Sequence, residues 1–216
     1  MIAPTNDPMS QMTIRLHRGD LPDLTAYKGA VAIDTETMGL DPARDRLCVV
    51  QLSPGDGSAD VVQIAAGQTR APNLERLLAD TAIVKLFHYA RFDLAALAKA
   101  FKVMPQPVYC TKIASRLART YTDRHGLKDL AREVLGIDLS KQQQSSDWGA
   151  ETLTDAQVAY AASDVLHLHA LRERLDAMLA REGRAELAAA CFRFLPDRVR
   201  LDLAGWSDQD IFSHSM

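Results

Sequence analysis

An aspartate and a glutamate stand at the end of a stretch that otherwise has the composition of a buried strand. The stretch AVAIDTE, residues 30–36, runs from apolar residues into Asp34 and Glu36, and a second apolar run, DRLCVVQLS, follows at residues 45–53. Alternate residues of a strand point to the same side of a sheet, so both carboxylates would face one spot. Two like charges repel at that separation, so such a fold must place something there that offsets them.

The order of the periodic segments predicts an α/β fold with a mixed central sheet flanked by helices. An edge-like strand is expected at 13–22, followed by a meander of three strands at 30–36, 45–53 and 59–66, and then by a buried strand at 82–89. Helical spacing predicts helices at 71–80, 91–101, 111–121, 126–136 and 154–183. The last of these begins with Thr154 and Gln157, which have the spacing of a capping box.

The length of 216 residues suits a single domain. Residues 1–12 have neither the basic nor the apolar region of a secretory signal and are expected to form a flexible leader. Residues 13–216 would then form the domain. The apolar segment 183–216 is expected to pack, either over the sheet of its own chain or between protomers.

Composition and charge narrow the class of protein. The net charge of −3 argues against a protein that coats long nucleic acid, although a short or locally held nucleic acid remains compatible with it. Cys48, Cys110 and Cys191 form no C-x-x-C pair and lie in apolar surroundings, which predicts reduced packing residues in a cytoplasmic protein. No apolar run approaches the length that a bilayer requires.

Two further acids stand in suggestive places. Asp93 lies at the start of a helix that follows a buried strand, where ligands of open α/β sheets collect, and Asp164 follows Tyr160 by four residues on one helix face. If the fold gathers Asp34, Glu36, Asp93 and Asp164, all-oxygen ligation suits Mg²⁺ or Mn²⁺, and two such ions can assist displacement at phosphorus. Tyr160 would then orient the attacking water, because a phenol is a poor base.

Each of these residues also has a plainer interpretation. Taken alone, Asp93 would more often be a helix cap, Asp164 a solvated helix acid and Tyr160 a core residue. Asp34 with Glu36 is harder to explain in that way, because the flanking apolar residues imply a buried sheet. The joint occurrence of all five favours a functional site.

The motifs DTET, RFD and YAASD resemble those of the DEDD superfamily of 3′-5′ exonucleases. The tyrosine four residues before the last aspartate is typical of the DEDDy branch, which includes ribonuclease D, whereas the other branch has histidine where Ala159 stands. The resemblance implies an RNase H-like fold and metal-dependent removal of nucleoside 5′-monophosphates by two ions per site. An arginine common in the family shortly after Trp148 is absent, so its contacts to long RNA are not carried over.

Several long strings, among them DRLCVVQLSPGDGSADVVQIA and TKIASRLARTYTDRHGLK, closely resemble the nanoRNase group, the compact single-domain members of this branch. The resemblance implies hydrolysis of short oligoribonucleotides, dinucleotides above all, by a ring-shaped homo-octamer. A DNA exonuclease with the same chemistry is the near alternative. A non-catalytic nucleic-acid-binding module is the distant one, and the presence of all five motif residues argues against it.

The substrate is expected near these motifs. By resemblance, Leu40 would stack against the bases as a wedge, with a core leucine under the loop as the alternative. The other candidate substrate contacts are Thr35, Met38, Gly39, His88, Tyr89 and Arg91. A basic stripe is expected to bind phosphate or to form a solvated face, and consists of Lys112, Arg116, Arg119, Arg124, His125 and Lys128. The polar loop 141–148 is either a mobile flap or a surface connector.

Overall fold

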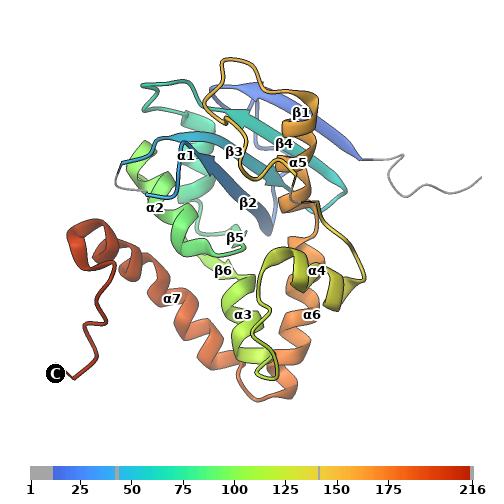
Figure 1. Cartoon of the computed structure of the whole chain (residues 1–216), viewed down its shortest axis with the longest axis vertical. Coiled ribbons are helices and arrows are strands. Elements are labelled where there is room, and N and C mark those ends of the chain that lie inside the picture. The colour runs from blue at the N-terminus through green and yellow to red at the C-terminus, as the bar shows by residue number, and fades with distance from the viewer. Residues whose placement is uncertain (1–11, 42–43, 141, 215–216) are drawn as a thin grey trace, which may run out of the picture.

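One mixed sheet runs through the centre of the molecule (Figure 1). The computed structural model describes residues 12–41, 44–140 and 142–214. Within these residues the sheet has six strands in the order β1-β4-β3-β2-β5-β6. Their bounds are Thr13–Arg18 for β1, Ala30–Thr37 for β2, Leu47–Ser53 for β3, Ser58–Gln63 for β4, Val84–Phe87 for β5 and Val108–Cys110 for β6.

The pairing of the strands confirms the predicted meander. Strands β2, β3 and β4 pair antiparallel, β1 joins the edge parallel to β4, and β5 and β6 pair parallel on the other side of β2. The register places Asp34 of β2 opposite Gln51 of β3. The short strand β6 was not predicted, because three residues are too few for a period-2 pattern to appear.

Helices cover both faces of the sheet. The helix bounds are Pro72–Ala79 for α1, Ala90–Phe101 for α2, Thr111–Ala118 for α3, Leu127–Leu135 for α4, Asp155–Leu166 for α5, Leu168–Arg181 for α6 and Ala185–Leu201 for α7. A π-helical turn, Asp202–Trp206, follows α7. Helices α1 and α2 share one buried cluster with the sheet, and α5 and α6 share a second cluster on the opposite face (Figure 1).

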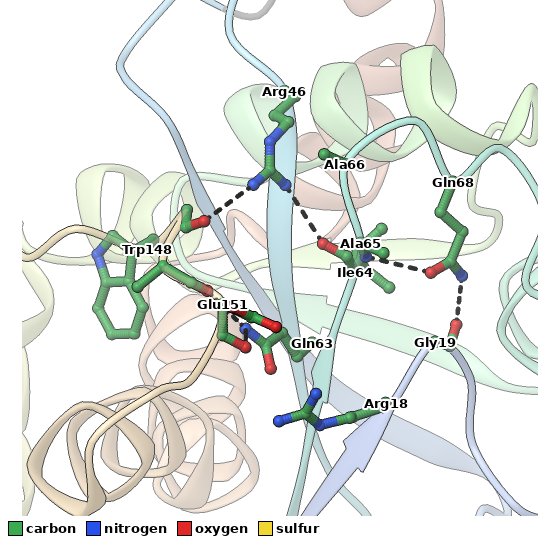
Figure 2. Close-up of a pocket in the computed structure, with 12 residues that line it drawn as sticks. Arg18, Gly19, Arg46, Gln63, Ile64, Ala65, Ala66, Gln68, Trp148 and Glu151 are labelled. Atoms are coloured by element: carbon green, nitrogen blue, oxygen red, sulfur yellow. Dashed lines mark hydrogen bonds between the residues drawn. The ribbon is translucent and has the colours of Figure 1, made fainter.

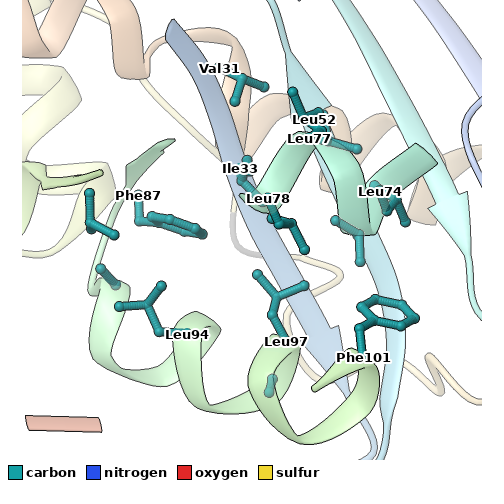
Figure 3. Close-up of a cluster of buried hydrophobic side chains, with 14 of the residues drawn as sticks. Val31, Ile33, Leu52, Leu74, Leu77, Leu78, Phe87, Leu94, Leu97 and Phe101 are labelled. Carbon is teal, nitrogen blue, oxygen red and sulfur yellow. The ribbon is translucent and has the colours of Figure 1, made fainter. Parts of the chain in front are cut away.

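The alternation of side chains along β2 determines where its acids point. Val31 and Ile33 belong to the cluster beneath α1 and α2 (Figure 3), whereas Ala32 belongs to the cluster beneath α5. Because successive side chains of a strand point to opposite faces, Asp34 and Glu36 lie on the α5 side. The intervening Thr35 lies on the α2 side.

The prediction of one long helix over 154–183 was wrong in one respect. It is interrupted at His167, where φ is −106° and ψ is −3°, so that α5 and α6 are separate helices. The two halves have different partners, since α5 packs on the sheet whereas α6 packs on α3 and α4. Both halves are amphipathic, so the sequence pattern continues through the break.

The C-terminal part of the chain returns to the sheet. Helix α7 packs against α2, α3 and β6, and buries Leu195 and Val199 in the first cluster.

Cys48 and Cys110 are buried and, with Cys191, are free thiols, as predicted. The predicted leader, apart from Met12, lies outside the described residues. No helix within the described parts of the chain is long and apolar enough to cross a membrane.

A buried carboxylate attaches the edge strand β1 to the sheet. Asp60 of β4 is 4% exposed and accepts hydrogen bonds from Arg15 Nε at 2.7 Å and from the Tyr27 hydroxyl at 2.6 Å. The His17 ring nitrogen lies 2.7 Å from the same carboxylate. Burial opposes ionisation of Asp60, but these hydrogen bonds outweigh it and lower its pKa to about 2.

A depressed pKa makes this contribution to stability dependent on pH. Ionised Asp60 stabilises the fold above the ordinary aspartate pKa of about 4, and that stabilisation is lost as the pH falls toward 2. We expect Asp60→Asn to lower the free energy of unfolding by about 2 kcal/mol at pH 7. Urea unfolding of parent and variant at pH 7 and at pH 2 measures this difference in the free energy of unfolding. A difference of the same size at pH 2 would contradict a charge-based origin.

Candidate active site

Three carboxylates from two elements meet above the end of β2. Asp34 and Glu36 of β2 and Asp164 of α5 each offer an oxygen, and these oxygens lie within 4.8 Å of one another. The strand places its two acids on the α5 face, and α5 crosses that face with Asp164 turned toward them. The fold therefore brings together three of the four predicted acids at ligand distance.

Asp93 reaches the site from the other face of the sheet. It is 2% exposed in the first turn of α2, and its carboxylate accepts a hydrogen bond of 2.7 Å from the Thr35 hydroxyl. Tyr89, the residue just before α2, has φ 68° and ψ 44°, a left-handed conformation that is uncommon for a bulky residue. This conformation turns the chain directly from β5 into α2, so that Asp93 lies close to the carboxyl end of β5.

Gln51 is a site residue that was not predicted. Its side chain is fully buried on β3, and its amide Nε2 donates a hydrogen bond of 2.7 Å to Asp34 Oδ2. Its carbonyl oxygen has no hydrogen bond among the described residues. A buried glutamine within the apolar run LCVVQLS was the available signal, because a buried amide requires a polar partner.

The burial of these acids raises all of their pKa values. Desolvation followed by the neighbouring charges raises the pKa of Asp34 well above its usual range and that of Glu36 to about 8. Burial likewise raises the pKa of Asp93 and of Asp164 to about 7 each. The folded protein therefore resists full ionisation of the cluster unless positive charge is added.

The donor set fits a hard divalent cation. Asp34, Glu36 and Asp164 offer only carboxylate oxygens at mutual distances that one ion can bridge, and oxygen ligation is what Mg²⁺ and Mn²⁺ prefer. The positive charge of such an ion would offset the burial and the repulsion that keep these pKa values high.

Tyr160 lies beside the same acids, one helical turn before Asp164. Burial and the charges of Asp164, Glu36 and Asp34 raise the pKa of its phenol above the usual 10, so the hydroxyl keeps its proton. The ring packs against Trp148, with 6.0 Å between the ring centroids. A protonated, oriented phenol is suited to hold a water molecule and not to remove its proton.

The loop after β2 presents apolar side chains to solvent. Leu40 is 89% exposed and Met38 is 53% exposed, which excludes the alternative of a core leucine. Between them, Gly39 lies against the Asp45 carboxylate, since an added Cβ would lie 2.3 Å from Asp45 Oδ2 and would force that side chain to move. Thr35 was predicted to contact substrate, but its buried hydroxyl is already bonded to Asp93.

The candidates around the start of α2 have internal partners. The His88 ring nitrogen Nδ1 lies 2.9 Å from the Thr111 hydroxyl, and burial lowers the His88 pKa to about 3. The Tyr89 ring carries the Lys112 ammonium 4.3 Å above its centroid. Arg91 forms an ion pair with Asp202, in which Nε lies 2.5 Å from a carboxylate oxygen.

The prediction of a basic stripe was wrong for one residue. Arg119 is fully buried, donates to the Ser115 hydroxyl and to the Arg124 carbonyl, and pairs with Glu133. Its charge is used inside the fold, because it anchors the loop between α3 and α4. Of the predicted flap, residue 141 lies outside the described residues, and Trp148 at its other end is buried.

The comparison with protein families identifies this arrangement. Residues 20–180 match the family model described as 3′-5′ exonuclease. The chain belongs to the 3′-5′ exonuclease family. A ribonuclease D from Gluconacetobacter diazotrophicus is 37% identical over 167 residues, which are 77% of this chain and 42% of that protein. The chain thus spans less than half the length of this relative.

Solved structures extend the similarity to nearly the whole exonuclease chain. A structure of Brucella melitensis NrnC with bound Mg²⁺ is 63% identical, with a TM-score of 0.92, over 94% of this chain and 100% of that one. A structure of Brucella melitensis NrnC bound to pGG is 64% identical with the same coverage and TM-score. These neighbours confirm the predicted RNase H-like fold.

The raised pKa values predict how divalent ions stabilise this exonuclease. Without metal, the folded chain binds more protons than the unfolded chain between about pH 4 and pH 7, so its stability falls as the pH rises through that window. Ions bind the ionised carboxylates, so their stabilising effect grows with pH. We expect Mg²⁺ to raise the melting temperature more at about pH 8 than at about pH 5.5.

Differential scanning calorimetry with and without Mg²⁺ provides this comparison. Asp34→Asn should abolish the ion-dependent increase, whereas Asp129→Asn, on the distant helix α4, should preserve it. An equal increase at both pH values would contradict the assignment of these acids as ligands.

The position of the Gln51 amide predicts that its removal weakens ion binding without a matching loss of stability. Gln51→Leu removes the donor that orients Asp34, and we expect the affinity for Mn²⁺ to fall about tenfold. The free energy of unfolding should change little, because removal of a buried unpaired carbonyl oxygen offsets the hydrogen bond that Asp34 loses.

Titration calorimetry and urea unfolding measure the two quantities. Ser53→Ala, two residues along the same strand, is the control that should leave the ion affinity unchanged. Unchanged ion affinity in Gln51→Leu would show that Asp34 needs no support from β3.

Proposed function

We propose that this protein is a metal-dependent 3′-5′ exoribonuclease that hydrolyses short oligoribonucleotides, dinucleotides above all, to nucleoside 5′-monophosphates. The observation that carries the proposal is the meeting of Asp34, Glu36 and Asp164 within 4.8 Å, beside the protonated phenol of Tyr160. Membership of the exonuclease family supports the reaction class. The Mg²⁺ bound in the similar NrnC structure supports the choice of ion.

In the proposed reaction, Asp34, Glu36, Asp93 and Asp164 would hold two divalent ions, Mg²⁺ or Mn²⁺. When bound, such ions offset the carboxylates and stabilise the charge that develops on the phosphate oxygens. The oxygen of water forms a bond to phosphorus, and the bond from phosphorus to O3′ of the preceding nucleotide breaks. In the net reaction one proton of the water ends on that O3′.

The residues of this chain would position the reactants. The Tyr160 phenol keeps its proton and orients the attacking water through a hydrogen bond. Thr35 and Gln51 hold Asp93 and Asp34 with hydrogen bonds of 2.7 Å each, so the ligands are oriented before any ion arrives.

The preference for short substrates is supported by the surroundings of Leu40. Its exposed side chain could stack against a base of any identity, which suits an enzyme without sequence preference. A cavity of about 490 Å³ lies between Leu40, Tyr89 and the C-terminal residues Asp202 and Leu203. The similarity to an NrnC bound to the dinucleotide pGG points in the same direction.

We also propose that the protein assembles with copies of itself, the octamer being the form that the sequence resemblance implies. Large apolar side chains remain exposed along α7 and the segment after it, where a second copy could cover them: Leu187, Phe194, Leu203, Trp206, Ile211 and Phe212. A cytoplasmic location stays a prediction.

Initial rates against substrate length test the proposed function. With 5′-labelled RNAs of two to about ten nucleotides, the matching DNAs, and either Mg²⁺ or EDTA, we expect the fastest hydrolysis for dinucleotide RNA and none with EDTA. Asp93→Asn should lower the rate at least about a hundredfold, because it removes an anionic ligand. Asp129→Asn is the matched control.

Each other outcome would change a different part of the proposal. Equal or faster attack on long RNA or on DNA would overturn the substrate and favour the DNA exonuclease. Hydrolysis by Asp93→Asn at the parent rate would overturn the metal site. The absence of hydrolysis with either ion would favour a binding module.

A further inference from the structure

The segment 147–151, which carries Trp148, is held in place by the side chains of Arg46 and Gln63, which are distant from it in the sequence (Figure 2). Arg46, just before β3, donates from Nη2 to the Gly149 carbonyl at 3.3 Å and from Nη1 to the Leu47 and Ile64 carbonyls at 3.2 Å each. One guanidinium therefore joins the segment to the starting end of β3 and to the residue after β4.

A second side chain holds the next part of the same segment. Gln63, the last residue of β4, donates from Nε2 to the Ala150 carbonyl at 2.9 Å and to the Glu151 carbonyl at 3.3 Å. At the other end, Gln157 of α5 donates to the Asp147 carbonyl at 3.1 Å. Four backbone carbonyls of the segment, those of Asp147, Gly149, Ala150 and Glu151, are thus bonded to side-chain amides or to a guanidinium, and not to the backbone of a strand.

Hydrogen bonds matter here because close packing is incomplete on one side of the segment. A cavity of about 510 Å³ lies between the segment and the β1–β4 edge, and its lining includes Arg18, Arg46, Gln63 and Trp148 (Figure 2). On this side, among the residues that the structure describes, no core side chain fills the space, and Trp148 anchors the segment to the buried cluster on the other side. Arg46 and Gln63 reach along the cavity wall and restrain the segment there.

The restrained segment ends against the candidate catalytic tyrosine. Trp148 is 4% exposed, and its ring lies 6.0 Å from the Tyr160 ring with 37° between the planes. Aromatic rings at this separation are in contact, so the buried Trp148 ring limits the rotation of the Tyr160 ring on one side. A shift of Trp148 would remove one of the two contacts that fix the Tyr160 ring, the other being the hydrogen bond between its hydroxyl and Asp164.

The segment also touches the loop after β2. A Cβ added to Gly149 would lie 2.3 Å from Met38 Sδ and 3.3 Å from Arg46 Nη2, so the glycine lies directly against both side chains. Arg46 therefore borders both the exposed apolar loop and the segment that supports Tyr160.

We propose that Arg46 and Gln63 are positioning residues, which act through Trp148 to fix the Tyr160 phenol over the acidic cluster. This inference rests on the proposed exonuclease function. Neither residue touches the acids, and their effect is on the turnover number, because the water that Tyr160 orients takes part in the chemical step.

A double-mutant cycle tests this coupling. We expect Arg46→Met to lower kcat about tenfold and to change KM less than about twofold, since substrate contacts remain in place. Combined with Tyr160→Phe, which removes the hydroxyl, Arg46→Met should cost less than about a further twofold. Gln63→Met should behave in the same way, and provides the test if Arg46→Met does not fold.

Arg18→Met is the matched control. Arg18 borders the same cavity, yet its side chain makes no hydrogen bond or ion pair among the residues that the structure describes (Figure 2). The Arg18→Met variant should keep the kcat of the parent protein. An unchanged kcat in Arg46→Met, or an equal loss with and without the Tyr160 hydroxyl, would overturn the proposal.

Fluorescence separates this inference from the proposed function. The chain has two tryptophans, so in a Trp206→Phe background the emission reports on Trp148 alone. We expect Arg46→Met to shift that emission and Arg18→Met not to shift it. If the parent protein hydrolyses nothing, the proposed function fails while this shift still tests the restraint, and unchanged emission overturns it.

Discussion

The repulsion among carboxylates at the end of β2 is the constraint on which the rest of the site depends. Asp34, Glu36 and Asp164 lie within 4.8 Å of one another in a partly buried place. Burial raises the pKa values of all three, and the neighbouring charges raise those of Asp34 and Glu36 further. The fold keeps this unfavourable arrangement because the apolar clusters on both faces of the sheet hold β2 and α5 in position. Burial of apolar surface thus stabilises a geometry that is complete only with cations.

Neutral hydrogen-bond donors orient the acids without supplying that charge. The Thr35 hydroxyl serves Asp93 on the α2 side of the sheet, and the Gln51 amide serves Asp34 on the other side. A lysine or arginine in either place would offset the negative charge and weaken the attraction for an ion. Amide and hydroxyl groups instead fix direction and leave the charge for the metal.

The tyrosine ring has one support that the acids lack, because Tyr160 of α5 packs against Trp148, which lies in a loop that also contributes to the second buried cluster. Trp148 supports the Tyr160 ring, and Arg46 and Gln63 support the backbone around Trp148 next to an open cavity. The backbone of Tyr160 is thus as fixed as that of Asp164 on the same helix, whereas the loop that supports its ring is held to the strands by a few hydrogen bonds. Such bonds contribute about 1 kcal/mol each, so this part of the site is the easier one to displace.

The sequence by itself determined what depends on local spacing. Alternation along β2 placed Asp34 and Glu36 on one face, and four-residue spacing placed Tyr160 beside Asp164, because both periods follow from backbone geometry. Only the tertiary structure decided the contacts between distant residues. The bond between Gln51 and Asp34 depends on strand register, and the bond between Arg46 and Gly149 spans 103 positions. No local period encodes either contact, since each results from how separately formed elements pack.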